Sequence, residues 1–130
     1  MKEPVWIRQD VVLRMHEEAL MLHGGPEGVR DPGLLESALA RPKNLFAYAE
    51  QDISMARFAA AYAVGIIANH PFVDGNKRTA FTVSLTFLKL NGLEVTATKE
   101  ARVLTFWSLA AGEISEEQLT LWLERNTAPR

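Results

Sequence analysis

The residues best suited to chemistry are concentrated in one short stretch of the chain. Its sequence is His70-Pro71-Phe72-Val73-Asp74-Gly75-Asn76-Lys77-Arg78, and it lies between the two most hydrophobic segments of the protein. Histidine is the side chain best suited to move protons near neutral pH, so His70 is a candidate general base. Asp74 offers a carboxylate, a hard ligand that suits Mg²⁺. A base and a candidate metal ligand therefore lie within one turn-sized segment.

The residues after Asp74 are suited to binding phosphate. Gly75, Asn76 and Lys77 are expected to open a helix, whose first N–H groups have no partner within the helix and form an anion site. Lys77 and Arg78 add positive charge, and Arg78 can make a forked contact with a phosphate. Two cations at the positive end of a helix are unfavourable unless an anion binds there. The stretch therefore indicates phosphoryl or nucleotidyl transfer.

Other kinds of site fit less well. The stretch Gly75–Thr79 lacks the first glycine and the residue order of a Walker loop. The other histidines, His16 and His23, are expected in the first helix as surface or packing residues. Taken singly, a histidine at a helix end or an aspartate before a helix is usually structural. Phe72 is expected to be a purely structural anchor that holds the loop against the core.

Composition narrows the classes of protein further. The chain has 130 residues, no cysteine and a formal net charge of −2. These values exclude a disulfide scaffold, a thiolate zinc site and a cysteine nucleophile, and they argue against direct nucleic-acid binding. The longest apolar run, Phe58–Ala68, is 11 residues long, whereas about 20 are needed to span a membrane. We therefore expect one domain over residues 1–130, cytoplasmic and without membrane contact.

Hydrophobic spacing predicts helices along most of the chain. A first helix ends before Gly24, a second starts at Asp31 and is ended by Pro42, and residues 43–51 are expected to form an apolar loop. Asp52 is the expected N-cap of a third helix, buried nearly all round, which Pro71 breaks.

The second half of the chain continues this pattern. A fourth helix is expected from Gly75 to Asn91, a fifth over Lys99–Ala111, and a sixth after a capping box at Ser115. Thr127–Arg130 is expected to be frayed, and no strand pattern is long enough to make a sheet. The predicted fold is an all-α helical bundle whose active-site loop lies between two central helices.

The stretch His70–Arg78 resembles the H-x-F-x-[D/E]-G-N-[G/K]-R signature of the Fic/Doc superfamily, with all of its fixed positions present. Arg30–Pro42 and Gly75–Gly92 are similar to the death-on-curing (Doc) branch. AMP-transferring Fic enzymes usually have glycine where this chain has Lys77, and a second arginine where it has Phe81. The resemblance is therefore to Doc, and it implies an all-helical fold.

The same resemblance implies an activity and its cofactors. Doc-type toxins use ATP and Mg²⁺ and transfer the γ-phosphate to a threonine of elongation factor Tu. The resemblance assigns His70 as the base and Asp74 as the metal ligand. It also makes Asn76, Lys77 and Arg78 catalytic and assigns the nucleotide phosphates to Gly75, Asn76, Lys77 and Arg78. The alternatives are nucleotidyl (AMP) transfer and a catalytically inactive binding module.

The resemblance also implies a partner, an antitoxin of the prevents-host-death (Phd) type. The inhibitory helix of self-inhibited Fic proteins is missing, because Arg125 breaks its pattern after Glu124. Inhibition by a separate chain is the expected arrangement. The first helix and the Arg30–Arg41 segment are expected to form part of the antitoxin groove or a flap over the target, because an apolar loop at Leu45, Phe46 and Tyr48 needs covering.

Overall fold

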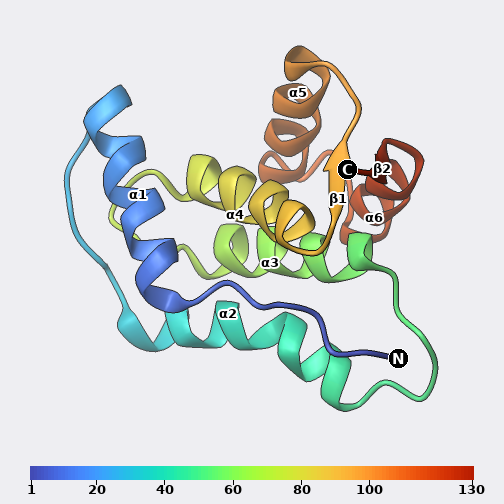
Figure 1. Ribbon diagram of the computed structural model, residues 1–130. Helices are drawn as coiled ribbons and strands as arrows, with labels where there is room; N and C mark the ends of the chain where they lie inside the picture. Colours follow the sequence, from blue (N-terminus) through green and yellow to red (C-terminus); the bar gives the residue numbers. More distant parts are fainter.

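A computed structural model describes residues 1–130 and consists of six helices and one small sheet (Figure 1). The elements in chain order are α1 (Gln9–His23), α2 (Pro32–Ala47), α3 (Met55–Asn69), α4 (Asn76–Leu90), β1 (Leu93–Val95), α5 (Lys99–Ala110), α6 (Glu116–Arg125) and β2 (Thr127–Pro129). The all-α fold class predicted from the sequence is confirmed. None of the helices combines the length and the hydropathy needed to cross a membrane.

Helix α3 is the centre of the fold, and α2, α4 and α6 pack around it (Figure 1). Its sequence explains this position, because a run of small alanines allows neighbouring helices to approach closely on several sides. The fully buried residues of α3 are Phe58, Ala59, Ala60, Ala61, Tyr62, Ala63 and Ile66. The prediction that this helix is buried nearly all round is confirmed.

Pro42 does not end α2, and this prediction from the sequence was wrong. The helix continues to Ala47 with Pro42 buried inside it, so the expected loop after it is largely helical. A proline removes one backbone hydrogen bond and crowds the carbonyl four residues earlier, which here belongs to Ala38. That carbonyl faces Gly65 of α3, where a side-chain Cβ would lie only 3.1 Å from the Ala38 oxygen. The absence of a side chain at Gly65 leaves room for this carbonyl between the two helices.

Two further predictions were wrong at element ends. The N-cap of α3 is Ser54, which accepts a hydrogen bond from the Arg57 N–H, whereas Asp52 lies near the amino terminus of the chain. The carboxyl end of the chain is not frayed, because β2 pairs with β1 in an antiparallel two-stranded sheet. Such short strands carry no periodic signal in the sequence, and they form because the chain end returns to α4. The capping box at Ser115 is confirmed.

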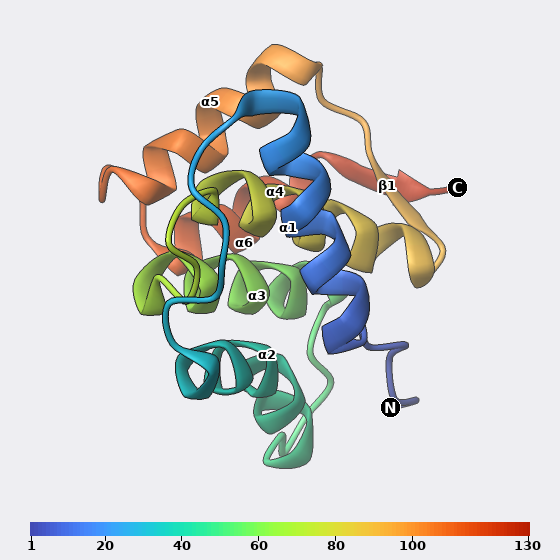
Figure 2. The same cartoon turned by 90° about the vertical axis from the view of Figure 1, so that its left-hand side faces the viewer.

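The segment between α1 and α2 runs beside the loop that joins α3 to α4 (Figure 2). Val29 forms an isolated antiparallel bridge with Phe72. The Arg30 N–H donates to the Pro71 carbonyl at 2.7 Å, and the Val73 N–H donates to the Gly28 carbonyl at 3.1 Å. The motif loop is therefore held on one side by backbone hydrogen bonds to a segment more than forty residues earlier.

Candidate functional site

The motif loop begins with a left-handed residue at the end of α3. His70 has φ 49° and ψ 54° and is the only non-glycine residue with a positive φ. This conformation turns the chain sharply out of the helix. Arg30 stabilises the turn, because its guanidinium donates to the carbonyls of His70 at 2.8 Å and Asn69 at 2.9 Å. A cation at a helix carboxyl end is also favoured by the helix dipole.

Phe72 anchors the loop in the core, as predicted. Its side chain is fully buried, and its ring stacks on the His16 imidazole with centroids 3.8 Å apart. His16 lies in α1, so this contact joins the first helix to the motif. The sequence gives no sign of this link, because the two residues are far apart in the chain and neither lies in a pattern that pairs them.

Asn76 holds the loop together from within. Its side chain is 6% exposed and accepts a hydrogen bond from the Phe72 N–H at 3.0 Å. The amide nitrogen donates to the Phe72 carbonyl at 3.0 Å and lies 3.1 Å from Nδ1 of His70. Asn76 was expected to contact phosphates, but these three contacts turn its side chain towards the loop. Only its backbone N–H remains for an anion.

The contact with Asn76 also orients the imidazole of His70. The two Phe72 hydrogen bonds fix which end of the Asn76 amide is nitrogen, and an amide nitrogen can only donate. Nδ1 of His70 therefore acts as an acceptor, and the neutral ring carries its hydrogen on Nε2. Nε2 has no hydrogen-bond partner within the chain and is the nitrogen left for a substrate.

Asp74 is held by its backbone and keeps part of its carboxylate available. Its carbonyl accepts a hydrogen bond from Nε2 of His16 at 2.7 Å, and its Oδ1 accepts one from the Gly75 N–H at 2.8 Å. The chain contains no cluster of three metal-binding side chains. A single exposed carboxylate fits Mg²⁺, which commonly binds one or two carboxylates together with phosphate oxygens and water. The residues present are therefore compatible with the expected metal.

The start of α4 has unpaired N–H groups and positive charge. Gly75 is the N-cap, without a side-chain hydrogen bond, and the N–H groups of Asn76, Lys77 and Arg78 have no acceptor in the chain. No acidic residue lies in this first turn, and neither cationic side chain takes part in an ion pair. Three unpaired N–H groups and two unpaired cations point to a ligand with several negative charges.

These groups open on one cavity of about 410 Å³. His70, Asp74 and Gly75–Arg78 all line it, so the structure brings together every site residue predicted from the sequence. Ile67 from α3 and Trp107 and Ala110 from α5 complete its wall. The sequence analysis missed these three because their apolar spacing indicates only a helix face packed against the core.

Trp107 is the most informative of the missed residues. Its ring lies 5.4 Å from Nζ of Lys77, a cation–π contact that holds the lysine at the cavity wall. Phe81 packs edge to face against Trp107, with ring centroids 6.3 Å apart, and against Phe106, with ring centroids 5.2 Å apart. Phe81 therefore belongs to an aromatic cluster at the position where AMP-transferring relatives carry an arginine.

Comparison with known proteins agrees with this geometry. The model of the Fic/DOC family matches residues 6–88, which include the whole motif loop and α4 up to Leu88. The chain belongs to the Fic/DOC family. It is 34% identical to the protein kinase doc of Escherichia phage P1 over 119 residues, covering 92% of this chain and 93% of the phage protein.

A second Doc relative matches a shorter part of the chain. Toxin Doc of Mycolicibacterium smegmatis is 42% identical over 74 residues, which are 57% of each protein. Both relatives support the resemblance to the Doc branch that was drawn from Lys77 and Phe81. The chain is thus a Doc-like member of its family, related over nearly its full length to a protein named as a kinase.

Proposed function

We propose that this protein is a Doc-like toxin that transfers the γ-phosphate of ATP to a serine or threonine hydroxyl of another protein. The observation that carries the proposal is the start of α4. Three unpaired N–H groups and the unpaired cations Lys77 and Arg78 share one cavity with His70. A triphosphate and a hydroxyl could therefore meet there with a proton acceptor beside them.

Catalysis would come mainly from charge and positioning. The N–H groups of Asn76, Lys77 and Arg78 orient the phosphates, and Lys77 and Arg78 offset negative charge that moves as the bond to the leaving group breaks. Asp74 would hold Mg²⁺, which supplies further neutralisation of phosphate charge when it is bound. Loss of one positioned charge of this kind costs about 10²–10³ in rate.

His70 is proposed to take the proton of the attacking hydroxyl. The hydroxyl oxygen forms a bond to the γ-phosphorus, the bond from that phosphorus to the β–γ bridging oxygen breaks, and ADP leaves. The proton of the hydroxyl passes to Nε2 of His70, which can accept it only in the tautomer that carries the ring hydrogen on Nδ1. Because Asn76 donates to Nδ1 in this structure, the ring hydrogen must move from Nε2 to Nδ1 and the Asn76 contact must break when substrates bind. Catalytic hydrogen bonds commonly tighten or shift in the substrate complex.

The aromatic cluster around Phe81 favours γ-phosphate transfer over AMP transfer. Phe81 packs against Phe106 and Trp107 and offers no charge to the terminal phosphates of a nucleotide bound in the AMP-transferring sense. In the proposed kinase reaction, the γ-phosphate of ATP lies nearest Lys77 and Arg78 instead. AMP transfer is the competing reaction to be excluded by experiment.

The decisive experiment supplies ATP labelled at either the α or the γ position, with Mg²⁺ and a protein substrate. Elongation factor Tu is the first substrate to try, because the Doc resemblance implies it. Label from the γ position and a mass gain of one phosphate would support the proposal. Label from the α position, with a mass gain of one AMP, would establish nucleotidyl transfer instead.

A catalytically inactive binding module is the third possibility. Growth arrest on induction of the wild-type chain, compared with the His70→Ala variant, separates binding from catalysis. The proposal expects arrest only with the wild-type chain. Equal arrest by both would remove His70 as the base and favour inhibition by binding alone.

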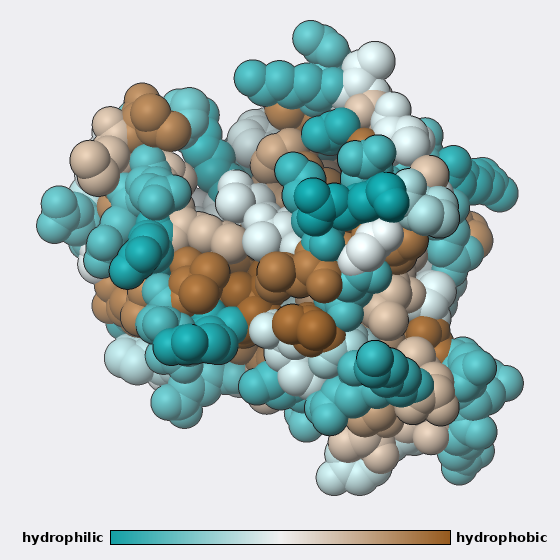
Figure 3. Space-filling view, in the orientation of Figure 1, coloured by the Kyte–Doolittle hydropathy of each residue, from teal (hydrophilic) through white to brown (hydrophobic).

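We further propose a Phd-like antitoxin as the partner of this chain. The surface is hollowed between α1 and α5 (Figure 3). The groove there has a volume of about 460 Å³ and is lined by Met15, Ala19, Leu22, Phe81, Val103 and Trp107, with Arg78 at its edge. Arg78 and Trp107 also line the phosphate cavity, so a partner in this groove would touch the site.

The apolar segment that motivated the expected antitoxin surface is only partly covered. Phe46 is half-buried against Trp6 and Phe58, with ring centroids 6.1 Å and 6.5 Å apart, whereas Tyr48 is 84% exposed. Of the two expected parts of that surface, only α1 contributes residues to this groove. Crosslinking of the co-expressed antitoxin should map to Leu22 and Val103, and a complex that leaves both unprotected would refute this placement.

A further inference from the structure

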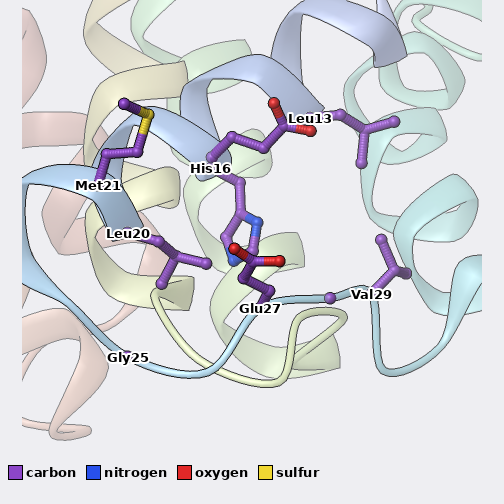
Figure 4. A pocket seen from close by; sticks show the side chains of 9 residues that line it. Leu13, His16, Leu20, Met21, Gly25, Glu27 and Val29 are labelled. Carbon is purple, nitrogen blue, oxygen red and sulfur yellow. The ribbon is translucent and has the colours of Figure 1, made fainter.

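A second cavity lies behind the motif loop and takes no part in the proposed transfer. It occupies about 410 Å³ between α1 and the segment that follows it, and it shares no lining residue with the phosphate cavity (Figure 4). Its apolar wall is formed by Leu13, Leu20, Met21 and Val29. Its polar side chains are His16, Glu17 and Glu27, and each of them can accept hydrogen bonds.

His16 is the polar residue that shows a missing partner. It is 3% exposed, and its Nε2 donates to the Asp74 carbonyl. One face of the ring is covered by Phe72, and the Cδ2–Nε2 edge faces Gly75. The Nδ1 edge is therefore the one left at the cavity, where the ring extends from α1 towards Glu27 (Figure 4). Nδ1 has no hydrogen-bond partner in the chain, and in the neutral ring it is the nitrogen that can accept a hydrogen bond from a ligand.

The two carboxylates lack partners as well. Glu17 and Glu27 take part in none of the four ion pairs of the structure and in none of its side-chain hydrogen bonds. The three acceptors do not form a metal-binding cluster. An anion is disfavoured by the two negative charges. The ligand must therefore carry several donors and positive charge, and it must be larger than a metal ion.

We propose that this cavity binds an alkyl guanidinium or alkyl ammonium group. The charged end would donate to Nδ1 of His16 and to the carboxylates of Glu17 and Glu27, while the alkyl stem would lie along Leu13, Leu20 and Val29. An arginine or lysine side chain of another protein and a free amine have this chemistry in common. The proposal does not depend on phosphate transfer, because no catalytic group is involved.

A ligand bound in this cavity would lie next to the motif loop. Its walls include His16, which holds the carbonyl of Asp74, and Gly25, where a Cβ would lie 2.5 Å from Oδ2 of Asp74. A ligand held by His16 would therefore sit directly behind the residue proposed to bind Mg²⁺.

Binding can be measured by NMR titration of the isotope-labelled full-length chain with butylguanidinium. The expected result is a saturating shift of the His16 imidazole and of the Gly25 and Gly28 amides. N-butylurea has the same shape without the charge and should give no saturating shift. A peptide with one arginine between two glycines serves as the second probe, and tighter binding of the peptide would identify a protein partner as the source.

Variants make the test specific. Glu17→Gln and Glu27→Gln should each weaken butylguanidinium binding about two- to five-fold, as expected for a carboxylate at the mouth of a cavity. Glu18→Gln is the matched control, because Glu18 is equally exposed on α1 but does not line this cavity. All three residues lie on the surface, so the variants should fold normally. No saturating shift, or the same affinity in the Glu17→Gln/Glu27→Gln double variant, would overturn the proposal.

Discussion

Replacing His70 by glycine should make the protein more stable than replacing it by alanine. Both variants lose the imidazole and its contact with Asn76, so this loss cancels in the comparison. The left-handed conformation at position 70, with φ 49° and ψ 54°, costs an L-residue about 1–2 kcal/mol. Glycine adopts it freely. The two variants therefore report the backbone strain at the position of the proposed base, with the imidazole absent from both.

The size of the effect follows from two opposing terms. Glycine removes about 1–2 kcal/mol of strain but loses about 0.4–1 kcal/mol through the larger entropy of its unfolded chain. Position 70 is exposed, so neither variant creates a cavity. The glycine variant should exceed the alanine variant by about 0.5–1 kcal/mol, or roughly 2–4 °C in Tm for a chain of this length.

Urea and thermal unfolding of the purified variants would measure this difference. The slope of the free energy of unfolding against urea should be the same for both variants, because the surface exposed does not change. Ala68→Gly is the control: it lies exposed in the last turn of α3 and should cost about 0.5–1 kcal/mol, the opposite sign. A glycine variant no more stable than the alanine variant would show that position 70 is not strained.

Three other perturbations test the packing. The carboxylate of Glu116 in α6 forms ion pairs with Arg41 and Arg57, both at 2.6 Å. Glu116→Gln should lower the free energy of unfolding by about 1–2 kcal/mol, less than the loss of a fully buried pair, because the arginines are partly exposed. An unchanged midpoint of urea unfolding would contradict this. Gly65→Ala places a Cβ 3.1 Å from a carbonyl oxygen of α2. It should lower the free energy of unfolding by about 1–2 kcal/mol, although alanine is the better helix former. A higher Tm would mean that α2 and α3 can move apart at little cost. Burial raises the pKa of Tyr62 above its usual value of 10, so its neutral form stabilises the fold fully below pH 10 and progressively less as the pH rises through the higher folded-state value. Unfolding at alkaline pH should therefore depend less on pH in Tyr62→Phe than in the wild-type chain, and equal dependence would exclude Tyr62 as the cause.

Much of the site could be predicted because its signals are local. His70, Asp74 and the start of α4 lie within nine residues, and a helix N-terminus with two cations has a physical meaning that requires no tertiary contact. The burial of α3 was predictable for the same reason, since its apolar spacing is unbroken. The chemistry expected of these residues is still a prediction for the labelled-ATP experiment.

The residues that support the site came only from tertiary structure. Trp107 and His16 lie on helices whose apolar spacing is that of an ordinary buried face, and nothing in that spacing says which loop they meet. Asn76 belongs to the motif, but its turn towards Phe72 and His70 depends on the folded loop.

Two of the prediction errors share one cause. The local preferences of Pro42 and of the last residues of the chain predict a helix end and a frayed terminus, whereas their conformation depends on partners far away in the sequence. Gly65 lies against the Ala38 carbonyl, four residues before Pro42, and β1 pairs with the carboxyl end. Local preferences are worth about 1–3 kcal/mol, and a few packing contacts of similar size reverse them. The chain's own pattern was thus enough to predict the helices and the motif loop between them, while the surroundings of that loop, including the cavity behind it, were set by how the helices pack.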